Sequence, residues 1–332
     1  MLKKEHDVSM KILTLQALLR RLPKHHLKRH QVEKELARRI AGLRGEESIN
    51  YELSLLQGKN EYIFQDLRLP NGEHYFQIDA LLLHPNFILT IEVKNIGGTI
   101  YFDKKFNQMI RILNDQEEVF PNPILQIKRQ RTHLKEFLNS HKIEDIPIES
   151  LIVFSNPYTL LKSSPEYTPQ ELSNIIQRAE LPFKIERFKQ TYNSEKLTPK
   201  DIRRLSSLLL KKHIPSPNTT LENYKINPGE LLKGVHCPNC FELPMQRKLR
   251  KWYCSQCKIF STTAHINSIF DYYLLLSETI TNRKLQDFLQ LPSRTSSLHL
   301  LRSMNLESIG TTKGTKYFLD FDTFSTLNRI SY

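Results

Sequence analysis

The stretch YFQIDALLLHPNFILTIEVK, residues 75–94, decides the fold of this 332-residue chain. It holds two apolar runs separated by His84-Pro85-Asn86, whose residue types are typical of a turn. A third apolar run, 62–67, precedes Pro70-Asn71-Gly72, which predicts a second turn. The pattern therefore predicts a three-stranded antiparallel meander.

The segments around the meander predict the other elements of an α/β fold. Apolar residues at helical spacing predict two basic helices within 9–41, separated by Pro23, and a helix from Gly45 to about Gln57, closed by Gly58. Asn122-Pro123 offers an N-cap and a first-turn proline for a helix to about Asn139, and the apolar run 151–154 predicts a strand. The order from residue 45 is thus helix, three strands, helix, strand. A strand at 184–188 and a helix from Thr198-Pro199 to Lys212 complete this part of the prediction.

Three charged residues lie on the second and third predicted strands. Glu92 and Lys94 end the third strand and share one face, because side chains alternate across a strand; Asp79 of the second strand completes a cluster if it lies on that face. Two carboxylates suit Mg²⁺, and the ammonium group of Lys94 could orient or activate a water molecule. The spacing alone leaves an ordinary cross-strand ion pair equally open.

Several motifs taken together resemble the nuclease-related domain, NERD, which is grouped with the PD-(D/E)XK nucleases. They are Gly45-Glu46, Asp66-Leu67-Arg68-Leu69-Pro70, Gln77-Ile78-Asp79, Ile91-Glu92-Val93-Lys94-Asn95 with Gly97-Gly98, and Asn122-Pro123-x-x-Gln126. The resemblance covers roughly residues 30–155, and the preceding Leu18–Pro23 is similar to the lead-in of bacterial members. It implies an α/β fold with a PD-(D/E)XK-like αβββαβ core, although Ile78 stands where the group's name has proline.

The resemblance also implies roles for individual residues. Asp79 and Glu92 would bind Mg²⁺ or Mn²⁺, and Lys94 would position the attacking water. Glu46 would be an additional acidic residue of the site, and Gln126 a supporting polar contact. Two alternatives stay open, because a carboxylate in the first turn of a helix is favourable anyway, and Gln126 could be an ordinary surface residue.

All four cysteines of the chain form two close pairs. Cys237-Pro238-Asn239-Cys240 and Cys254-Ser255-Gln256-Cys257 can each wrap one side of a tetrahedral Zn²⁺ ion. This spacing predicts a zinc ribbon whose site is structural and closed. His236 and His265 are then not needed as zinc ligands, because four thiolates fill the coordination sphere.

The last seventy residues resemble a winged helix-turn-helix at the level of motifs. Residues 284–289 and 295–304 predict two helices around a turn at Leu291-Pro292-Ser293, and 313–319 predicts a hairpin. On that resemblance the residues expected to contact DNA are Arg294, Ser296, Ser297, His299, Lys313 and Lys316. A small protein-interaction domain is the alternative, since such folds are reused.

The charge distribution indicates a polyanionic partner. Of the net charge of +13, residues 1–44 carry +8 and residues 228–332 carry +5. Lysine and arginine contacts release counterions from phosphates, which gives sequence-independent affinity for nucleic acid. A solvated, soluble surface is the alternative interpretation.

These observations divide the chain into a basic helical segment (1–44), a NERD nuclease-like domain (45–212), a linker (213–230), a zinc ribbon (231–263) and a winged-helix-like domain (264–332). No apolar run approaches the roughly 18–20 residues of a membrane helix, and the N-terminus does not resemble a signal peptide. Paired cysteines indicate a reducing compartment, so we expect a cytoplasmic protein.

The predicted function is metal-dependent hydrolysis of DNA by the nuclease-like domain, targeted by the basic flanks and the C-terminal domains. The competing hypothesis is a DNA-binding adaptor or regulator with little or no turnover. RNA cleavage also stays open, and no protein partner is indicated.

Overall fold

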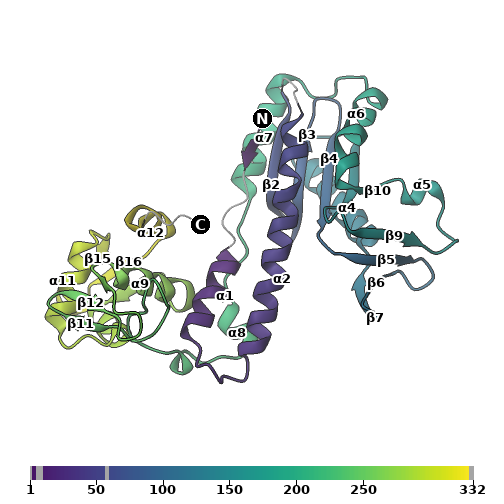
Figure 1. Cartoon of the computed structure of the whole chain (residues 1–332). Helices are drawn as coiled ribbons and strands as arrows, with labels where there is room; N and C mark the ends of the chain where they lie inside the picture. The colour runs from purple at the N-terminus through teal and green to yellow at the C-terminus, as the bar shows by residue number, and fades with distance from the viewer. Residues whose placement is uncertain (1, 5–9, 57–59, 329–332) are drawn as a thin grey trace. The chain divides into compact units, whose positions relative to one another are not determined.

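A computed structural model describes residues 2–4, 10–56 and 60–328, without the side chains of Lys313, Ser325, Leu327 and Asn328. The predicted helix end at Gln57 and Gly58 lies outside these residues. The chain divides into two compact units, shown by the ribbon in Figure 1. The central unit is built from the described parts of 1–7 and 40–216, and the composite unit from those of 8–39 and 217–332.

A six-stranded sheet forms the middle of the central unit. Its strands, in spatial order, are β1 (Leu2–Lys4), β2 (Tyr62–Asn71), β3 (His74–Leu83), β4 (Ile88–Lys94), β8 (Ile148–Phe154) and β10 (Ile175–Gln177). Strands β2, β3 and β4 pair in antiparallel fashion, so the predicted meander is confirmed. Its first turn contains Gly72 in the left-handed region, with φ of +59°, which glycine adopts without steric cost. Strand β8 then pairs with β4 in parallel.

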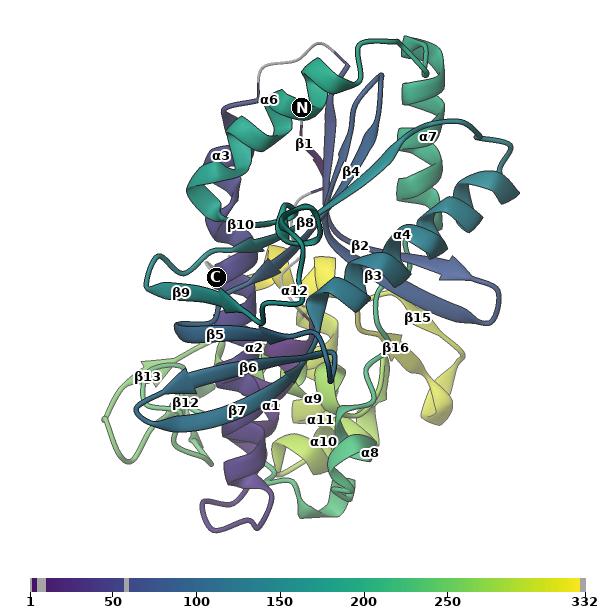
Figure 2. The ribbon, with the colours of Figure 1, turned by 90° about the vertical axis from the view of Figure 1, so that its right-hand side faces the viewer.

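Helices cover both faces of this sheet, as Figure 2 shows. On one face, α4 (Pro123–Ser140) and α7 (Pro199–Lys212) pack on the sheet around Leu134, Phe137 and Ile202. On the other, α3 (Asn50–Ser54) and α6 (Leu181–Thr191) pack around Leu53 and Ile185. The result is a three-layer α/β unit, which agrees with the predicted fold class at that level.

Helices α4 and α7 begin where their caps predict. The side chain of Asn122 accepts a hydrogen bond from the amide of Ile124, and that of Thr198 accepts one from the amide of Asp201.

The predicted strand at 184–188 is wrong. The segment 184–188 lies in α6 and is not a strand, because its apolar residues Ile185 and Phe188 recur at helical spacing and face the α3 side of the sheet.

The predicted helix start at Gly45 is also wrong. Helix α2 runs from Arg29 to Ser48 and passes through Gly45 without a break. Only then does the chain turn at Ile49 into the short α3. Glu46 therefore lies in the last turn of a long helix and not in the first turn of a new one.

A second sheet, which the sequence did not suggest, follows β4. It orders β7 (Gln116–Pro121), β6 (Gln108–Leu113), β5 (Gly98–Asp103) and β9 (Thr159–Ser163). Strands β6 and β7 are joined by Asn114 and Asp115, which have φ of 51° and 58°, as a two-residue hairpin requires. Ile100 and Phe102 of this sheet pack on Ile124 of α4 and Phe154 of β8. The short α5 (Pro169–Leu172) and the 3₁₀ turn η1 (Arg178–Glu180) complete the unit.

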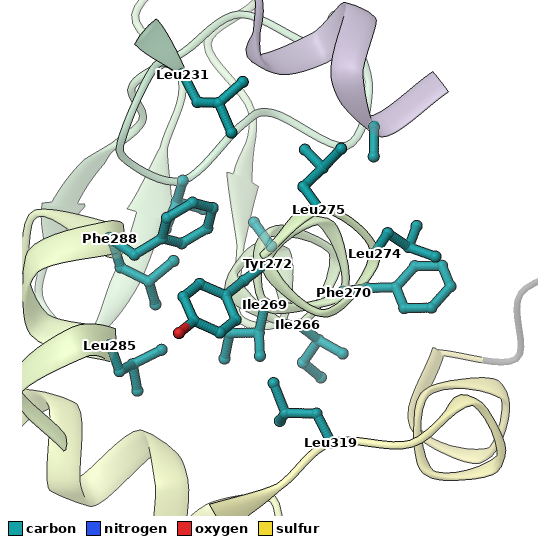
Figure 3. Close-up of a cluster of buried hydrophobic side chains, with 14 of the residues drawn as sticks. Leu231, Ile266, Ile269, Phe270, Tyr272, Leu274, Leu275, Leu285, Phe288 and Leu319 are labelled. Carbon is teal, nitrogen blue, oxygen red and sulfur yellow. The ribbon is translucent and has the colours of Figure 1, made fainter. Parts of the chain in front are cut away.

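The composite unit joins the N-terminal helix to the C-terminal third of the chain. Helix α1 (Met10–Arg21) contributes Leu15 and Leu18 to the same apolar core as α9 (Ala264–Leu275). Figure 3 shows α9 surrounded by this core. The side chains labelled in Figure 3 include Leu231, Ile266, Ile269, Tyr272, Leu285, Phe288 and Leu319.

A buried ion pair also links α1 to α9 within this unit. The side chains of Arg21 and Asp271 are both fully buried, and Arg21 Nε lies 2.9 Å from Asp271 Oδ2. Arg20 and His236 contact the same carboxylate, with nitrogen–oxygen distances of 2.7 and 3.2 Å. Because an unpaired charge in the interior is costly, these groups require one another.

The remaining elements of the composite unit are short. They are α8 (Thr220–Tyr224), η2 (Pro228–Glu230), β11 (Gln246–Lys248), β12 (Lys251–Tyr253), β13 (Phe260–Ser261), β14 (Thr279–Thr281), α10 (Asn282–Leu289), α11 (Arg294–Ser303), β15 (Ser308–Ile309), η3 (Thr312–Gly314), β16 (Lys316–Phe318) and α12 (Phe321–Asn328). Helix α8 lies inside the range predicted to be a linker, and its Thr220 is buried. Over the described residues, no helix combines the length and the hydropathy that a bilayer crossing requires.

Candidate functional site

The candidate site lies where β3 and β4 stop pairing. Their register runs from Leu83 opposite Ile88 to Ala80 opposite Ile91. Beyond this point a side chain takes the place of backbone pairing: the Asp79 Oδ2 atom accepts a hydrogen bond from the amide of Val93 at 2.8 Å. The end of β4 is thereby fixed against a carboxylate from β3.

Glu92 and Lys94 lie on the face of β4 that helix α4 covers. Glu92 is 3% exposed, and its Oε1 lies 2.5 Å from Lys94 Nζ. Lys94 Nζ also donates to Gln126 Oε1 at 3.2 Å, so Gln126 is not merely a surface residue. The alternative interpretation was an ordinary ion pair on a solvent-exposed face of the sheet. The Glu92–Lys94 pair instead lies on a face that helix α4 covers.

Gln130 is a member of this cluster that the sequence analysis missed. Its Nε2 donates to Glu92 Oε2 at 2.8 Å and to the backbone oxygen of Gln77 at 2.9 Å. Its Oε1 is buried and has no hydrogen-bond partner among the described residues. The four-residue spacing from Gln126, which returns to the same helix face, is the signal that could have identified it.

Glu46 reaches the site because α2 passes close to the ends of β4 and β8. A Cβ atom at Gly45 would lie 2.5 Å from Asn95 Cβ and 3.2 Å from Ser155 Oγ, so glycine permits this approach. At the C-terminal end of α2 a carboxylate is unfavourable to the helix dipole, which removes the helix-start explanation for Glu46.

The electrostatics of the cluster centre on Asp79. Burial raises the pKa of Asp79 well above its usual value, and the carboxylates of Glu92 and Glu46 raise it further. The hydrogen bond from Val93 and the charge of Lys94 oppose this shift without cancelling it. Ionisation of Asp79 is therefore opposed by burial and by two neighbouring carboxylates, which the ammonium group of Lys94 does not offset.

This charge balance fits a divalent cation bound by few protein atoms. Asp79 and Glu92 supply hard carboxylate oxygens, which Mg²⁺ and Mn²⁺ prefer. Among the described residues, no three acidic or histidine ligand atoms gather within 4.8 Å of one another. The candidate protein ligands are thus the two carboxylates of Asp79 and Glu92, and Mg²⁺, which loses its hydration shell reluctantly, requires few protein ligands.

Other polar residues near the motifs belong elsewhere. Gln77 is exposed and donates to Asp66 Oδ1 at 2.6 Å. His133 contacts Asn71 and Glu136, and His141 contacts the backbone of Phe137. Neither histidine takes part in the carboxylate site, in line with the absence of ligand spacing.

The four cysteines converge as their spacing predicts. All four Sγ atoms lie within 4.8 Å of one another. The Cys237–Cys257 and Cys240–Cys254 Sγ distances are both 3.5 Å. Four thiolates about 2.3 Å from one zinc ion would lie nearly 4 Å apart, so the cluster is compatible with tetrahedral Zn²⁺.

The two nearby histidines are engaged away from the cysteines. His236 Nδ1 contacts Ser268 Oγ and Asp271, and His265 Nδ1 accepts from Trp252 Nε1 at 3.3 Å. Both are buried. Four sulfur ligands without a histidine therefore make up the candidate zinc site.

The residues expected to contact DNA in the C-terminal region divide into two groups. Arg294, His299 and Lys316 are exposed, and Ser296 is partly exposed. Ser297 is fully buried and its Oγ donates to Arg294 O at 3.0 Å, so the expectation that it faces a groove is wrong. The side chain of Lys313 lies outside the described residues.

Comparisons with known proteins bear on the central unit. Neither the curated proteins nor the solved structures contain a significant match to the chain. A family model does match: the model of the nuclease-related domain, NERD, matches residues 41–155, which include Glu46, Asp79, Glu92, Lys94 and Gln126.

Proposed function

We propose that the central unit hydrolyses phosphodiester bonds of DNA with the help of Mg²⁺ or Mn²⁺, and that its core is of the PD-(D/E)XK type. The observation that carries this proposal is the meeting of Asp79, Glu92 and Lys94 where β3 and β4 separate. The order of helix α2, strands β2 to β4, helix α4 and strand β8 supports the assignment of the core.

Asp79 and Glu92 would hold the cation, with Glu46 adding negative charge to the site. The bound cation would polarise the phosphate and lower the pKa of a coordinated water. Asp79 is held for this role by the Val93 amide, and Glu92 by the side-chain amide of Gln130.

Lys94 would position the attacking water. An ammonium group has three N–H donors, and Glu92 and Gln126 accept two of them. The third donor remains for a water molecule or a phosphate oxygen. Gln126 thus acts through Lys94 and is a positioning residue.

The test is cleavage of supercoiled, linear and single-stranded DNA, and of RNA, with Mg²⁺ or Mn²⁺. Asp79→Ala, Glu92→Ala and Lys94→Ala should each lose nearly all activity, because the three groups act as one unit. Glu136→Gln, which changes an exposed carboxylate on α4, is the matched control and should retain it. Wild-type protein that binds DNA but cleaves none of these substrates would overturn the nuclease proposal and favour a DNA-bound adaptor.

We propose that the composite unit delivers nucleic acid to the central unit. It holds 23 Lys and Arg against 11 Asp and Glu, a net charge of +12, and the rest of the chain holds only +1. Such a field attracts a polyanion over roughly a Debye length, about 10 Å at 0.1 M salt.

Within this unit we propose a structural zinc ribbon and a winged-helix-like DNA-binding domain. Helices α10 and α11 joined by a turn, followed by the antiparallel β15–β16 hairpin, support the latter. Arg294, exposed at the start of α11, would contact base edges, and Lys316, exposed on the hairpin, would contact phosphates.

This second proposal is best tested in the full chain. Deletion of 228–332 would remove the core against which α1 packs, so point variants are the sharper test. Arg294→Ala should reduce discrimination between DNA sequences, whereas Lys316→Ala should weaken binding to all of them about equally. Unchanged affinity and salt dependence in both variants would favour a protein-interaction module.

A further inference from the structure

The three-stranded sheet around the cysteine cluster has two different faces. Strand pairing places Trp252 opposite Arg247 and Ser261, and Trp252 is buried. Arg247 stacks over the Trp252 ring at 4.6 Å, so this inner face is filled.

The outer face of the same sheet is open and carries aromatic rings. Tyr253 pairs with Phe260 across β12 and β13, and their ring centroids lie 4.9 Å apart. Phe260 is 58% exposed. Phe260 is thus a largely exposed apolar surface on this face of the sheet.

Lysines flank the two rings on this face. Lys248 and Lys251 form a cross-strand pair and are both exposed. Lys248 Nζ lies over the Tyr253 ring, 4.1 Å from its centroid, which holds a cation beside the aromatic pair. We call Lys248, Lys251, Tyr253 and Phe260 the ribbon platform.

The segment that carries the ribbon platform has side-chain charges of one sign. Residues 243–270 contain five Lys and Arg, namely Arg247, Lys248, Arg250, Lys251 and Lys258, and no Asp or Glu. Across the described part of the chain, none of these five takes part in an ion pair. Lys248 and Lys251, cations without an ion-pair partner among the described residues and on the same face as Tyr253 and Phe260, favour a ligand that combines negative charge with flat apolar surfaces.

We propose that the ribbon platform binds single-stranded nucleic acid, with a base stacked on Phe260 and the backbone phosphates on Lys248 and Lys251. In a duplex the base faces are already stacked on one another, so an aromatic platform discriminates in favour of unpaired strands. Stacking on an aromatic side chain is tolerant of base identity, and lysines contribute a salt-dependent term. This binding extends the proposed delivery of nucleic acid by the composite unit, but does not depend on catalysis.

The test measures binding of labelled 20-nucleotide dT and rU strands and of a 20-base-pair duplex, by fluorescence anisotropy without added divalent metal or chelator. Phe260→Leu should weaken binding of the single strands about tenfold and of the duplex less than twofold, because leucine keeps the apolar bulk but lacks the aromatic face. Phe260→Tyr, which keeps an aromatic ring, should bind the single strands with wild-type affinity. Unequal effects on dT and rU would tell DNA from RNA.

Two further variants separate stacking from charge and from general damage. Lys248→Gln with Lys251→Gln should make the slope of log affinity against log salt shallower by about 0.7 for each phosphate that a lysine no longer neutralises. Phe241→Leu, at an exposed aromatic of the first cysteine knuckle off the platform, should change nothing. Zinc content and Trp252 fluorescence confirm that each variant is folded.

The proposal is overturned if wild type does not prefer single strands, or if Phe260→Leu weakens duplex and single strands alike. Its failure is separable from that of the nuclease proposal. Cleavage lost in Glu92→Ala together with unchanged single-strand binding by Phe260→Leu would refute the ribbon platform alone. Weakened single-strand binding by Phe260→Leu together with unchanged cleavage by Glu92→Ala would refute the nuclease proposal alone.

Discussion

Removing the charge of Asp271 should unfold the composite unit far more readily than removing an exposed charge. Asp271 accepts from Arg21 Nε at 2.9 Å and from Arg20 Nη2 at 2.7 Å, and Arg21 itself is fully buried. In Asp271→Asn the guanidinium of Arg21 would keep its bonds to the backbone oxygens of Leu232 and Gly234, but would lose its counter-charge. Breaking one side of a buried pair costs about 3–5 kcal/mol.

The chain provides its own probe and its own control for this prediction. Trp252 is the single tryptophan and is buried in the composite unit, so its fluorescence follows the unfolding of that unit. With a dependence of about 2 kcal/mol per molar urea, the unfolding midpoint of Asp271→Asn should fall by roughly 2 M. Asp287→Asn breaks the Lys233–Asp287 pair, whose side chains are 40% and 67% exposed, and should cost less than about 1 kcal/mol.

The same site gives the sign of a pH dependence. Burial alone would raise the pKa of Asp271, but Arg20, His236 and Arg21 together hold it below its usual value. A carboxyl whose pKa is lower in the folded state stabilises the fold above its unfolded pKa of about 4, and this contribution is lost as the pH falls below it. The gap between wild type and Asp271→Asn should therefore be constant near neutrality and shrink in acid. Equal urea midpoints for Asp271→Asn and Asp287→Asn at pH 7 would refute the reasoning.

Three further predictions concern the zinc cluster, the carboxylate site and a buried histidine. The purified protein should contain one zinc ion per chain, and Cys254→Ser should lose the metal and destabilise the composite unit; elemental analysis that finds no zinc in reducing buffer would contradict this. Gln130→Leu should lower kcat at least tenfold while the central unit stays folded by circular dichroism, because Glu92 loses its amide donor; an unchanged kcat would remove Gln130 from the site. Burial, aided by Arg247, lowers the pKa of His265 to about 4, so the stability that neutral His265 provides is present above pH 6.5 and is lost as the pH falls toward 4. In His265→Gln the urea midpoint should therefore depend less on pH between 6.5 and 4 than in wild type. An unchanged pH dependence would contradict this prediction.

The local sequence determined the elements whose signals lie within a few residues. Alternating apolar runs between two turns gave the β2–β4 meander, and the caps Asn122 and Thr198 gave the starts of α4 and α7. The two close cysteine pairs predicted their own cluster. In each case the physical cause, a turn, a cap or a short chelating loop, is contained in the segment itself.

Helix limits and short strands were less predictable. Gly45 suggested a helix start, yet α2 continues through it. The glycine does not interrupt the helix, and its lack of a side chain lets α2 approach Asn95 closely. Residues 184–188 carry β-branched and aromatic residues, yet the packing of α6 against the sheet decides for helix. Propensity is a weak guide where tertiary packing supplies most of the stabilisation.

Only the tertiary structure brought the residues of the candidate site together. The sequence named Asp79, Glu92, Lys94 and Gln126, but their contacts depend on where β3 leaves β4 and on which face of α4 meets the sheet. Gln130 entered the site for the same reason. The folding of α1 with a partner about 250 residues away, through Arg21 and Asp271, has no local signal at all. Such long-range pairings are selected by the burial of apolar surface and the neutralisation of buried charge, which depend on the whole fold and not on any one segment.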